Sequence, residues 1–323
     1  TLVGEQGAPV MADVISFDAT APQKSREVVR KLSGDIPKIA IQRAMNEKDY
    51  NEYKRLQFEC NGDADKLAVL NLAFKDQDFV YNGVRSRMEW MALQLLSRGG
   101  FALNASNNAG IVTVEFVGCG MPKENKRVST ADWSNSTSAN GLQDIADTLE
   151  EASQRGRMIK YIVMHTSDLI LLCKQKSTAE TLKGWINQTG RLTVTKDSIN
   201  AYLATLPVPA QIVTINSAVR YEDRAHVRKT VCPWERKRIA LIEDLRVGDI
   251  RYRPIDKAKD PSVLEVKKDF ITVSKWSELF MEWTKAEGHA MPVINDPEGL
   301  FLLRADNNPW PLYEDTEGWE VFL

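Results

Sequence analysis

Residues 34–57, GDIPKIAIQRAMNEKDYNEYKRLQ, alternate apolar and polar side chains and then run directly into a charged, helix-like stretch. Ile36, Ile39 and Ile41 are β-branched, and such residues favour a pleated, half-buried surface. The neighbouring sequence supplies little apolar surface to cover them. Either a distant part of the chain covers this strand, or another copy of the molecule does, and we favour another copy.

The sequence around this strand predicts an extended arm. Residues 9–18 predict a strand, residues 19–34 a long polar and basic excursion, and residues 35–44 a return strand. Because a two-stranded ribbon is marginal in water, we expect residues 9–45 to form a hairpin arm outside any compact core. Asn46 predicts the cap of a helix that ends at the Asn-Gly-Asp of residues 61–63.

A long helix is predicted over residues 78–98, ended by Gly99 and Gly100. Its apolar residues recur at spacings of three and four and form one narrow stripe: Val80, Val84, Met88, Met91 and Leu95. Gly83 lies inside it at a cost of about 1 kcal/mol relative to alanine. We expect this helix to lie across a surface rather than through a core.

The middle of the chain alternates helices and strands, which predicts an α/β or α+β domain. One helical face carries Leu142, Ile145, Ala146, Leu149 and Ala152 and closes at Gly156. Ser167 or Asp168 is the predicted cap of the next helix, and Ser177 with Glu180 fits a capping box. Strands are expected at residues 111–118, 210–222 and 236–244 and again towards residue 304.

Composition is that of an ordinary folded protein, with 43% hydrophobic residues, 27% charged residues and a formal charge of −2. No apolar run approaches the ~20 residues that span a bilayer, and no signal peptide is recognised. Charge is uneven: residues 21–57 hold nine bases and five acids, and residues 305–323 hold five acids and no base. This asymmetry indicates a solvated surface or, less often, contacts between copies.

No catalytic or metal-binding constellation stands out. His165 with Ser167 and Asp168 could be a triad fragment, but no GxSxG surrounds the serine and a helix cap is the favoured interpretation. His226 and His289 are expected to be surface or structural. Cys60, Cys119, Cys173 and Cys232 form no CxxC pair and predict reduced, buried thiols. Cofactors and metals are not expected, and the basic turn at residues 224–238 favours a solvated loop over a nucleic-acid site.

A chain with a basic hairpin arm, a narrow-striped helix and no catalytic group suggests a self-assembling structural protein, not an enzyme. Three stretches resemble the lambda-type (gpE-like) major capsid proteins of tailed bacteriophages. They are a helix with an inward-facing Asp-Ile pair followed by a buried strand (residues 142–175), a basic turn leading through a proline to a strand (219–252), and HAMPVINDPEGLFLLRA (289–305). Residues 47–78 and the tail after Asn307 have no counterpart in that pattern.

The resemblance implies an α+β fold of the Hong-Kong-97 type, with an E-loop hairpin, a long spine helix, a peripheral domain and an axial domain. The implied segments are residues 1–8 (N-terminal segment), 9–45 (E-loop), 46–140 (spine helix and peripheral domain), 141–255 (axial domain), 256–306 (return to the peripheral domain) and 307–323 (acidic tail). The spine helix corresponds to residues 78–98.

The implied function is a shell of hexamers and pentamers that encloses double-stranded DNA, located in the virion and assembled in the host cytoplasm. Portal, scaffolding and decoration proteins are implied partners, and a membrane is not. The E-loop would contact a neighbouring copy through Arg26, Arg30, Lys31, Lys38, Ile39, Ile41 and Arg43. A loop at the capsomer axis would carry Arg224, His226, Arg228, Lys229 and Trp234. An encapsulin-like nanocompartment and an enzyme with an unrecognised site remain alternatives.

Overall fold

The computed structural model describes residues 2–3, 30–31, 36–60, 76–103, 107–108, 114–187, 189–190, 192–222, 228–254, 262–278 and 281–311. The chain divides into two compact units. Unit 1 comprises Thr1–Ser33, Ala92–Asp249 and Val293–Leu323, and unit 2 comprises Gly34–Met91 and Ile250–Pro292. These units are not the segments expected from the sequence, so the names axial and peripheral stay predictions.

Unit 1 is built on a five-stranded mixed sheet with the strand order β6-β16-β11-β7-β8. The strands are β6 (Lys126–Val128), β16 (Phe301–Arg304), β11 (Arg238–Ile242), β7 (Tyr161–His165) and β8 (Gln211–Ile215). The outer pairs β6–β16 and β7–β8 are parallel, and β11 runs antiparallel to both of its neighbours. All five residues of β11 are buried, so this strand is the centre of the unit. β6 was not expected from the sequence.

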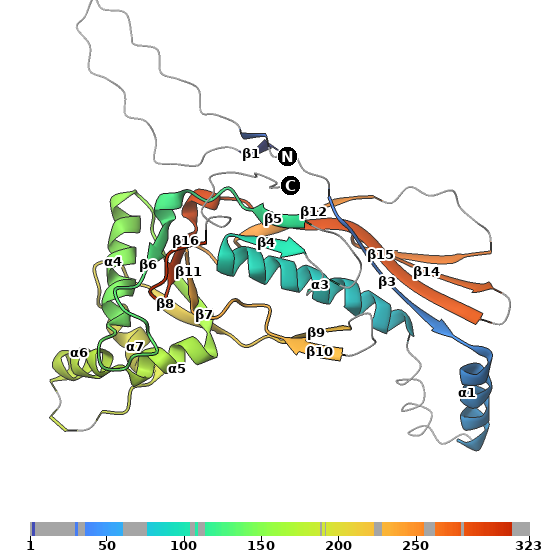
Figure 1. Ribbon diagram of the computed structural model, residues 1–323, viewed down its shortest axis with the longest axis horizontal. Helices are drawn as coiled ribbons and strands as arrows, with labels where there is room; N and C mark the ends of the chain where they lie inside the picture. Colours follow the sequence, from blue (N-terminus) through green and yellow to red (C-terminus); the bar gives the residue numbers. More distant parts are fainter. Residues whose placement is uncertain are drawn as a thin grey trace, which may run out of the picture. The chain divides into compact units, whose positions relative to one another are not determined.

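Four helices accompany this sheet (Figure 1). They are α4 (Gly141–Gln154), α5 (Thr166–Lys174), α6 (Lys176–Ile186) and α7 (Lys196–Leu203). α4 contacts β16, α5 contacts β7 and β8, α7 contacts β8, and α6 packs on the other three helices. The predicted face of α4 is confirmed at its buried leucines, isoleucine and Ala152, while Ala146 is half-buried. Asp144 also points inward and accepts a hydrogen bond from Trp133 Nε1 at 2.9 Å. The inward-facing Asp-Ile pair is therefore present.

The helix starts differ from the predicted caps. The cap of α5 is His165, whose Nδ1 accepts the backbone N–H of Ser167 at 3.1 Å, so Ser167 and Asp168 lie inside the first turn. At α6 the predicted capping box is absent, because Ser177 Oγ donates instead to the Ala139 carbonyl at 2.7 Å. A capping box does form at α7, between Thr195 and Ser198. The contacts of His165 and of Thr195 with Ser198 are local, whereas Ser177 is diverted by a carbonyl 38 residues away, which local spacing cannot reveal.

The described part of unit 1 also contains three two-stranded antiparallel pairs. β9 (Val219–Glu222) pairs with β10 (Arg228–Val231), and β4 (Gly100–Leu103) pairs with β5 (Val114–Gly118). β1 (Leu2–Val3) pairs with β2 (Arg30–Lys31). The strand expected at residues 111–118 is confirmed over residues 114–118. The strand expected at residues 210–222 is two strands, β8 and β9, because residues 216–218 break it.

Unit 2 holds the second sheet, in the strand order β12-β15-β14-β13, with β3 also paired to β15. Its strands are β12 (Gly248–Arg253), β15 (Met281–Ile294), β14 (Ile271–Glu278), β13 (Leu264–Lys268) and β3 (Lys38–Met45). β3 and β13 lie on opposite outer edges of this sheet. α1 (Glu47–Glu59) follows β3 directly, after Asn46, whose side chain accepts the N–H of Asp49 at 2.9 Å as predicted.

The long helix is α3 (Asp76–Arg98), and it ends at Gly99 with φ +72°. Every residue of the predicted stripe is buried, from Val80 and Val84 at 0% exposure to Met88 at 4%. Trp90, Gln94 and Ser97 are buried as well, so the buried face is wider than the stripe. The helix contributes to a core, and the expectation that it lies only across a surface is wrong.

Two glycines in helices predict stability changes of opposite sign. A Cβ on Gly141 would lie 2.6 Å from Leu172 Cδ1 and 2.8 Å from the ring of the buried Trp133, so Gly141→Ala should lower the free energy of unfolding by ~1–3 kcal/mol. A Cβ on Gly184 meets no atom within 4 Å, so Gly184→Ala should raise it by up to ~1 kcal/mol. Urea unfolding of both variants tests this pair, and two changes of the same sign would contradict it.

The four cysteines are free thiols, as predicted, but only Cys119 is buried. Burial raises the pKa of the Cys119 thiol to about 11, so it stays protonated at neutral pH. Cys60, Cys173 and Cys232 are partly exposed, which corrects the expectation that all four are buried.

Residues 307–311, expected to begin a free acidic tail, pack against unit 1. Trp310 is 9% exposed, its Nε1 donates to the Arg127 carbonyl at 3.0 Å, and the Arg238 guanidinium lies 4.1 Å from its ring centroid. Asp306 accepts hydrogen bonds from the Arg304 guanidinium and from the N–H of Asn308. The remainder of the predicted tail, residues 312–323, lies outside the described residues.

Asp306 predicts a loss of stability in acid. Burial works to raise its pKa, but the hydrogen bonds from Arg304 and Asn308 outweigh burial and lower the pKa to about 2. An aspartate in an unfolded chain has a pKa of about 3.9. The contribution of ionised Asp306 to the free energy of unfolding is therefore complete above that pH and is lost as the pH falls towards 2. Allowing for solvent screening at a side chain that is 21% exposed, we expect ~1–2 kcal/mol. Urea unfolding from pH 5 to pH 2 should show a shallower decline in Asp306→Asn, and an unchanged slope would contradict this.

Candidate assembly surfaces

The isoleucines of β3 have their core within the same chain. β3 is antiparallel to β15, with Ile41 opposite Ala286 and Ile39 opposite Gly288. Both isoleucines pack against a cluster made by α3, β14 and β15: Val80, Val84, Ile271, Val273 and Ala286. The expectation that another copy supplies their core is therefore wrong, but both side chains are only partly buried, and a contact of Ile39 and Ile41 with a neighbouring copy stays a prediction. The strand that pairs with β3 lies about 245 residues later in the chain, so the sequence next to β3 could not indicate it.

The same contact explains the glycine inside α3. A Cβ on Gly83 would lie 2.8 Å from Cδ1 and 3.3 Å from Cγ2 of Ile41, closer than these atoms can normally approach. Gly83 thus lets the helix and β3 come close together, which offsets its poor helix propensity.

Two basic residues of β3 also have partners in the same chain. Lys38 Nζ lies 3.0 Å from Glu287 Oε2, and the Glu287 side chain is 1% exposed and also contacts Lys285 Nζ at 2.9 Å. Arg43 lies 3.0 Å from Asp76, with its guanidinium 4.9 Å from the centroid of the Phe79 ring. Burial raises the pKa of Asp76, and Arg43 opposes that shift. Lys38 and Arg43 therefore need no acidic partner on a neighbouring copy.

The other predicted arm residues are only partly described. Arg30 and Lys31 form the two-residue strand β2, while Arg26 and the predicted strand at residues 9–18 lie outside the described residues. Contacts of Arg26, Arg30 and Lys31 with a neighbouring copy stay predictions.

The predicted capsomer-axis loop coincides with the β9–β10 hairpin. Arg228 lies opposite Glu222 and Lys229 opposite Tyr221, and Lys229 is exposed. Arg224 and His226 belong to residues 223–227, which lie outside the described part of the chain. Trp234 differs from the others, because it is 1% exposed and its Nε1 donates to the Arg238 carbonyl at 2.9 Å. It anchors the segment after the hairpin and offers no surface to a neighbour.

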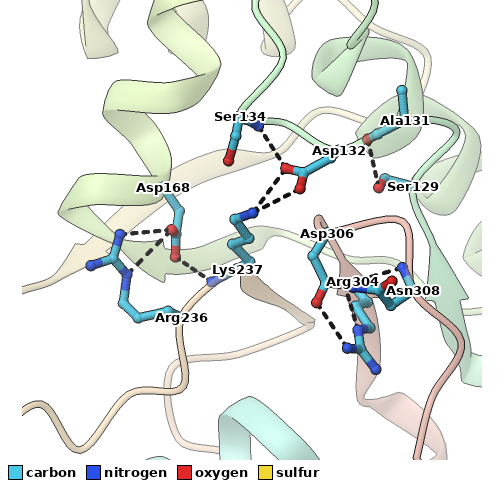
Figure 2. A network of polar contacts seen from close by, with 10 residues as sticks. All are labelled: Ser129, Ala131, Asp132, Ser134, Asp168, Arg236, Lys237, Arg304, Asp306 and Asn308. Atoms are coloured by element: carbon cyan, nitrogen blue, oxygen red, sulfur yellow. Dashed lines mark hydrogen bonds and ion pairs between the residues drawn. The ribbon is translucent and has the colours of Figure 1, made fainter.

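A polar network holds that segment to α5 (Figure 2). Asp168 is fully buried; it accepts hydrogen bonds from Arg236 Nη2 at 3.3 Å and from the N–H of Lys237 at 3.0 Å. Lys237 Nζ reaches both carboxylate oxygens of Asp132 at 2.9 Å. Burial raises the pKa of Asp168, and Arg236 opposes that shift. The turn between β10 and β11 is thereby fixed at the base of the hairpin.

His165 beside this network is structural. Burial lowers its pKa, and nearby Arg236 lowers it further, which favours the neutral ring that accepts the Ser167 N–H. Because that nitrogen bonds the backbone of Ser167 and not its hydroxyl, the geometry is that of a helix cap. The described residues contain no group of three potential metal ligands, and no described helix is long and apolar enough to cross a membrane.

Two exposed apolar surfaces in unit 2 were not predicted from the sequence. None of the 13 residues of α1 is buried, and Phe58 and Tyr50 are 87% and 46% exposed. All five residues of β13 are exposed, with Leu264 at 62% and Val266 at 54%. The alternation Leu-Glu-Val-Lys-Lys in β13 was the available signal for an edge strand.

Similarity to known proteins identifies the family of this chain. A family model described as phage major capsid protein E matches residues 1–304. No curated protein matches the chain. The structure of a protein assigned as a capsid protein of an Escherichia coli CFT073 prophage is 12% identical, with 83% of this chain and 76% of that chain covered and a TM-score of 0.50.

Two further solved structures are similar at lower scores. The bacteriophage PhiM1 mature capsid is 9% identical, covers 94% of this chain and 81% of its own, and has a TM-score of 0.41. The SrpI encapsulin of Synechococcus elongatus PCC 7942 is 10% identical, with 94% and 84% covered and a TM-score of 0.39. The predicted α+β fold, that of Hong-Kong-97-type capsid proteins, is confirmed. Since the family model spans nearly the whole sequence, this chain belongs to the phage major capsid protein E family.

Proposed function

We propose that copies of this chain assemble as hexamers and pentamers into an icosahedral phage head that encloses double-stranded DNA. The match of residues 1–304 to the phage major capsid protein E family carries this proposal. With a formal charge of −2, the chain has no overall attraction to DNA, so contacts with packaged DNA would come from local basic residues on phosphates and would read no sequence. The head would be the virion location of the protein, after assembly in the host cytoplasm.

The contacts between copies would involve the basic arm and the hairpin. Arg26, Arg30 and Lys31 would meet acidic residues of a neighbour, and residues 224–229 would lie near the capsomer centre. Individual exposed ion pairs contribute only ~0–1 kcal/mol, but a shell repeats each of them in every copy. The exposed parts of Ile39 and Ile41 would add to this contact, whereas Trp234 would not, because its side chain is enclosed in its own chain. Portal, scaffolding and decoration proteins would be further partners.

Electron microscopy of the purified protein tests this proposal. We expect capsomers and closed shells, and shells recovered from infected cells should hold nuclease-resistant double-stranded DNA. Monodisperse monomers at high protein concentration would contradict shell formation. Closed shells that contain a protein cargo and no DNA would contradict the phage head and indicate a nanocompartment.

A further inference from the structure

Strand β13 lies at an outer edge of the unit 2 sheet, and β14 is its only partner among the described strands. All five of its residues are exposed, with Leu264 at 62% and Val266 at 54%. Proteins commonly block such an edge with a proline or a bulge, because an open edge can pair with another chain. β13 contains no proline and pairs with β14 residue by residue without a bulge. Its side chains therefore decide which chain can pair with it.

These side chains divide between the two faces of the sheet. Leu264 and Val266 lie on one face, and Glu265 and Lys267 lie on the other, since a strand alternates its side chains. Glu265 accepts a long hydrogen bond from Ser274 Oγ at 3.5 Å, and neither Glu265 nor Lys267 forms an ion pair with a residue that the structure describes. One face of the edge is thus apolar, and the other carries one charge of each sign.

The sequence Leu-Glu-Val-Lys-Lys is complementary to itself when two copies of β13 pair antiparallel about Val266. In that register Val266 meets the same residue of the second copy, and Glu265 lies opposite Lys267 twice by symmetry. Leu264 lies opposite Lys268, whose aliphatic stem can pack on it. Opposite charges directly across an antiparallel pair stabilise it, and like charges destabilise it.

The same charges exclude the neighbouring registers. Centring the pair on Glu265 or on Lys267 would place that residue opposite itself in the second copy, so two like charges would meet. The register centred on Val266 avoids both contacts. Charge therefore specifies one register of self-pairing, which edge strands without such a pattern do not do.

We propose that β13 of one copy pairs antiparallel with β13 of a second copy and joins their two unit 2 sheets across a two-fold axis. The contact is isologous, because the same strand contributes on both sides. An icosahedral shell contains two-fold axes, so copies related in this way occur in it. Glu265 and Lys267 disfavour a strand with another charge pattern, which makes the contact specific for a second copy of this chain.

The contact belongs to the assembled shell. Five residues from each copy bury too little surface to hold two free subunits together, so the strands pair where other interfaces already bring the copies close. The inference rests on the proposed function, because it names one contact that joins copies in the shell.

A cysteine at the proposed two-fold axis tests the geometry. Directly opposed Cα atoms of antiparallel strands lie ~4.5–5.5 Å apart, a separation that a disulfide can bridge. Shells of Val266→Cys treated with a mild oxidant should therefore give at least tenfold more disulfide-linked dimer on a non-reducing gel than shells of the parent protein.

Leu264→Cys is the matched control for this experiment. It lies on the same face of β13 and is equally open to solvent, at 62% exposure against 54% for Val266. In the proposed register the two introduced cysteines would be four residues apart along the strand, ~13 Å, which is too far for a disulfide. Its shells should give no more dimer than those of the parent protein.

Charge reversal tests the register. Glu265→Lys and Lys267→Glu each place like charges opposite each other twice, so each should lower the yield of shells at least tenfold. The double variant restores opposite charges in reverse order and should recover at least half of the parent yield. Both side chains are exposed, so the thermal unfolding midpoint of the free subunit should stay unchanged. Glu278→Lys, at an exposed position of β14, is the control and should assemble like the parent protein.

Three results would each overturn the proposal. They are equal amounts of dimer from Val266→Cys and Leu264→Cys shells, normal shells from either single charge reversal, and no recovery in the double variant. If the parent protein forms shells and one of these results is found, only this contact is wrong. If the parent protein forms no shells, the proposed function itself fails, and this contact fails with it.

Discussion

Replacement of Trp234 by alanine should lower the free energy of unfolding by ~3–5 kcal/mol, the usual cost of emptying a buried tryptophan site. The indole is 1% exposed and donates to the Arg238 carbonyl, which would lose that partner. The residues on either side are also fixed, since Gln94 Nε2 donates to the Pro233 carbonyl at 2.7 Å and the Glu235 N–H donates to Ser97 Oγ at 3.2 Å. Loss of the indole would therefore weaken the contacts that hold Pro233 and Glu235 against α3.

Urea unfolding measures this effect, and Trp185→Ala is the matched control. Trp185 is 41% exposed and packs edge-on against Tyr202 at a centroid distance of 6.1 Å, so its loss should cost only ~1 kcal/mol. A Trp234→Ala subunit that keeps its stability but no longer assembles would restore Trp234 to the surface role that the sequence suggested.

Removing both lysines around Glu287 should cost far more than removing either. Lys38 and Lys285 contact the same carboxylate oxygen at 3.0 Å and 2.9 Å, and the carboxylate is 1% exposed. With one lysine left, the buried charge keeps a counterion, so Lys38→Met and Lys285→Met should each lower the unfolding free energy by ~1 kcal/mol or less. The double variant leaves the carboxylate with neither lysine and should lose ~3–5 kcal/mol.

The four proteins of this double-mutant cycle are compared by urea unfolding at pH 7. Lys275→Met is the control, because its pair with Glu282 at 2.6 Å is about one-third exposed on both sides and should contribute little. Additive losses in the cycle would show that Glu287 does not depend on this pair of lysines.

Features set by residues close in sequence could be predicted. The Asn46 cap, the buried stripe of α3 and the inward face of α4 follow from spacing alone, because a helix brings residues three and four apart onto one side. The pairing of β3 with β15 could not, since its register joins Lys38 to His289. The isoleucines of β3 were read as lacking a core partly for that reason, although Val80 and Val84 of α3, which also pack on them, lie only about 40 residues later.

The residues of the candidate assembly surfaces could likewise be predicted only in part. A basic cluster can be recognised in the sequence, but whether its charges are free to bind another copy cannot. Lys38 and Arg43, for example, form ion pairs with Glu287 and Asp76 of their own chain. The family resemblance assigned Trp234 to the capsomer-axis loop, and only the fold shows its side chain to be enclosed. Exposed β13, by contrast, carries an alternation that could have been noticed, although alternation does not tell which face is left uncovered.

Both sheets are completed by the last two strands of the described part of the chain. β15 (Met281–Ile294) is the only described strand that joins β3 to the rest of its sheet, and β16 (Phe301–Arg304) links β6 to β11 in the other. β15 pairs with β3 up to His289 and β16 ends at Arg304, so both sheets are completed only after about nine-tenths of the chain has been synthesised, and such non-local pairing is slow to form. A chain that ends before β15 therefore leaves β3 without its partner strand, and a chain that ends before β16 leaves β6 unconnected to β11.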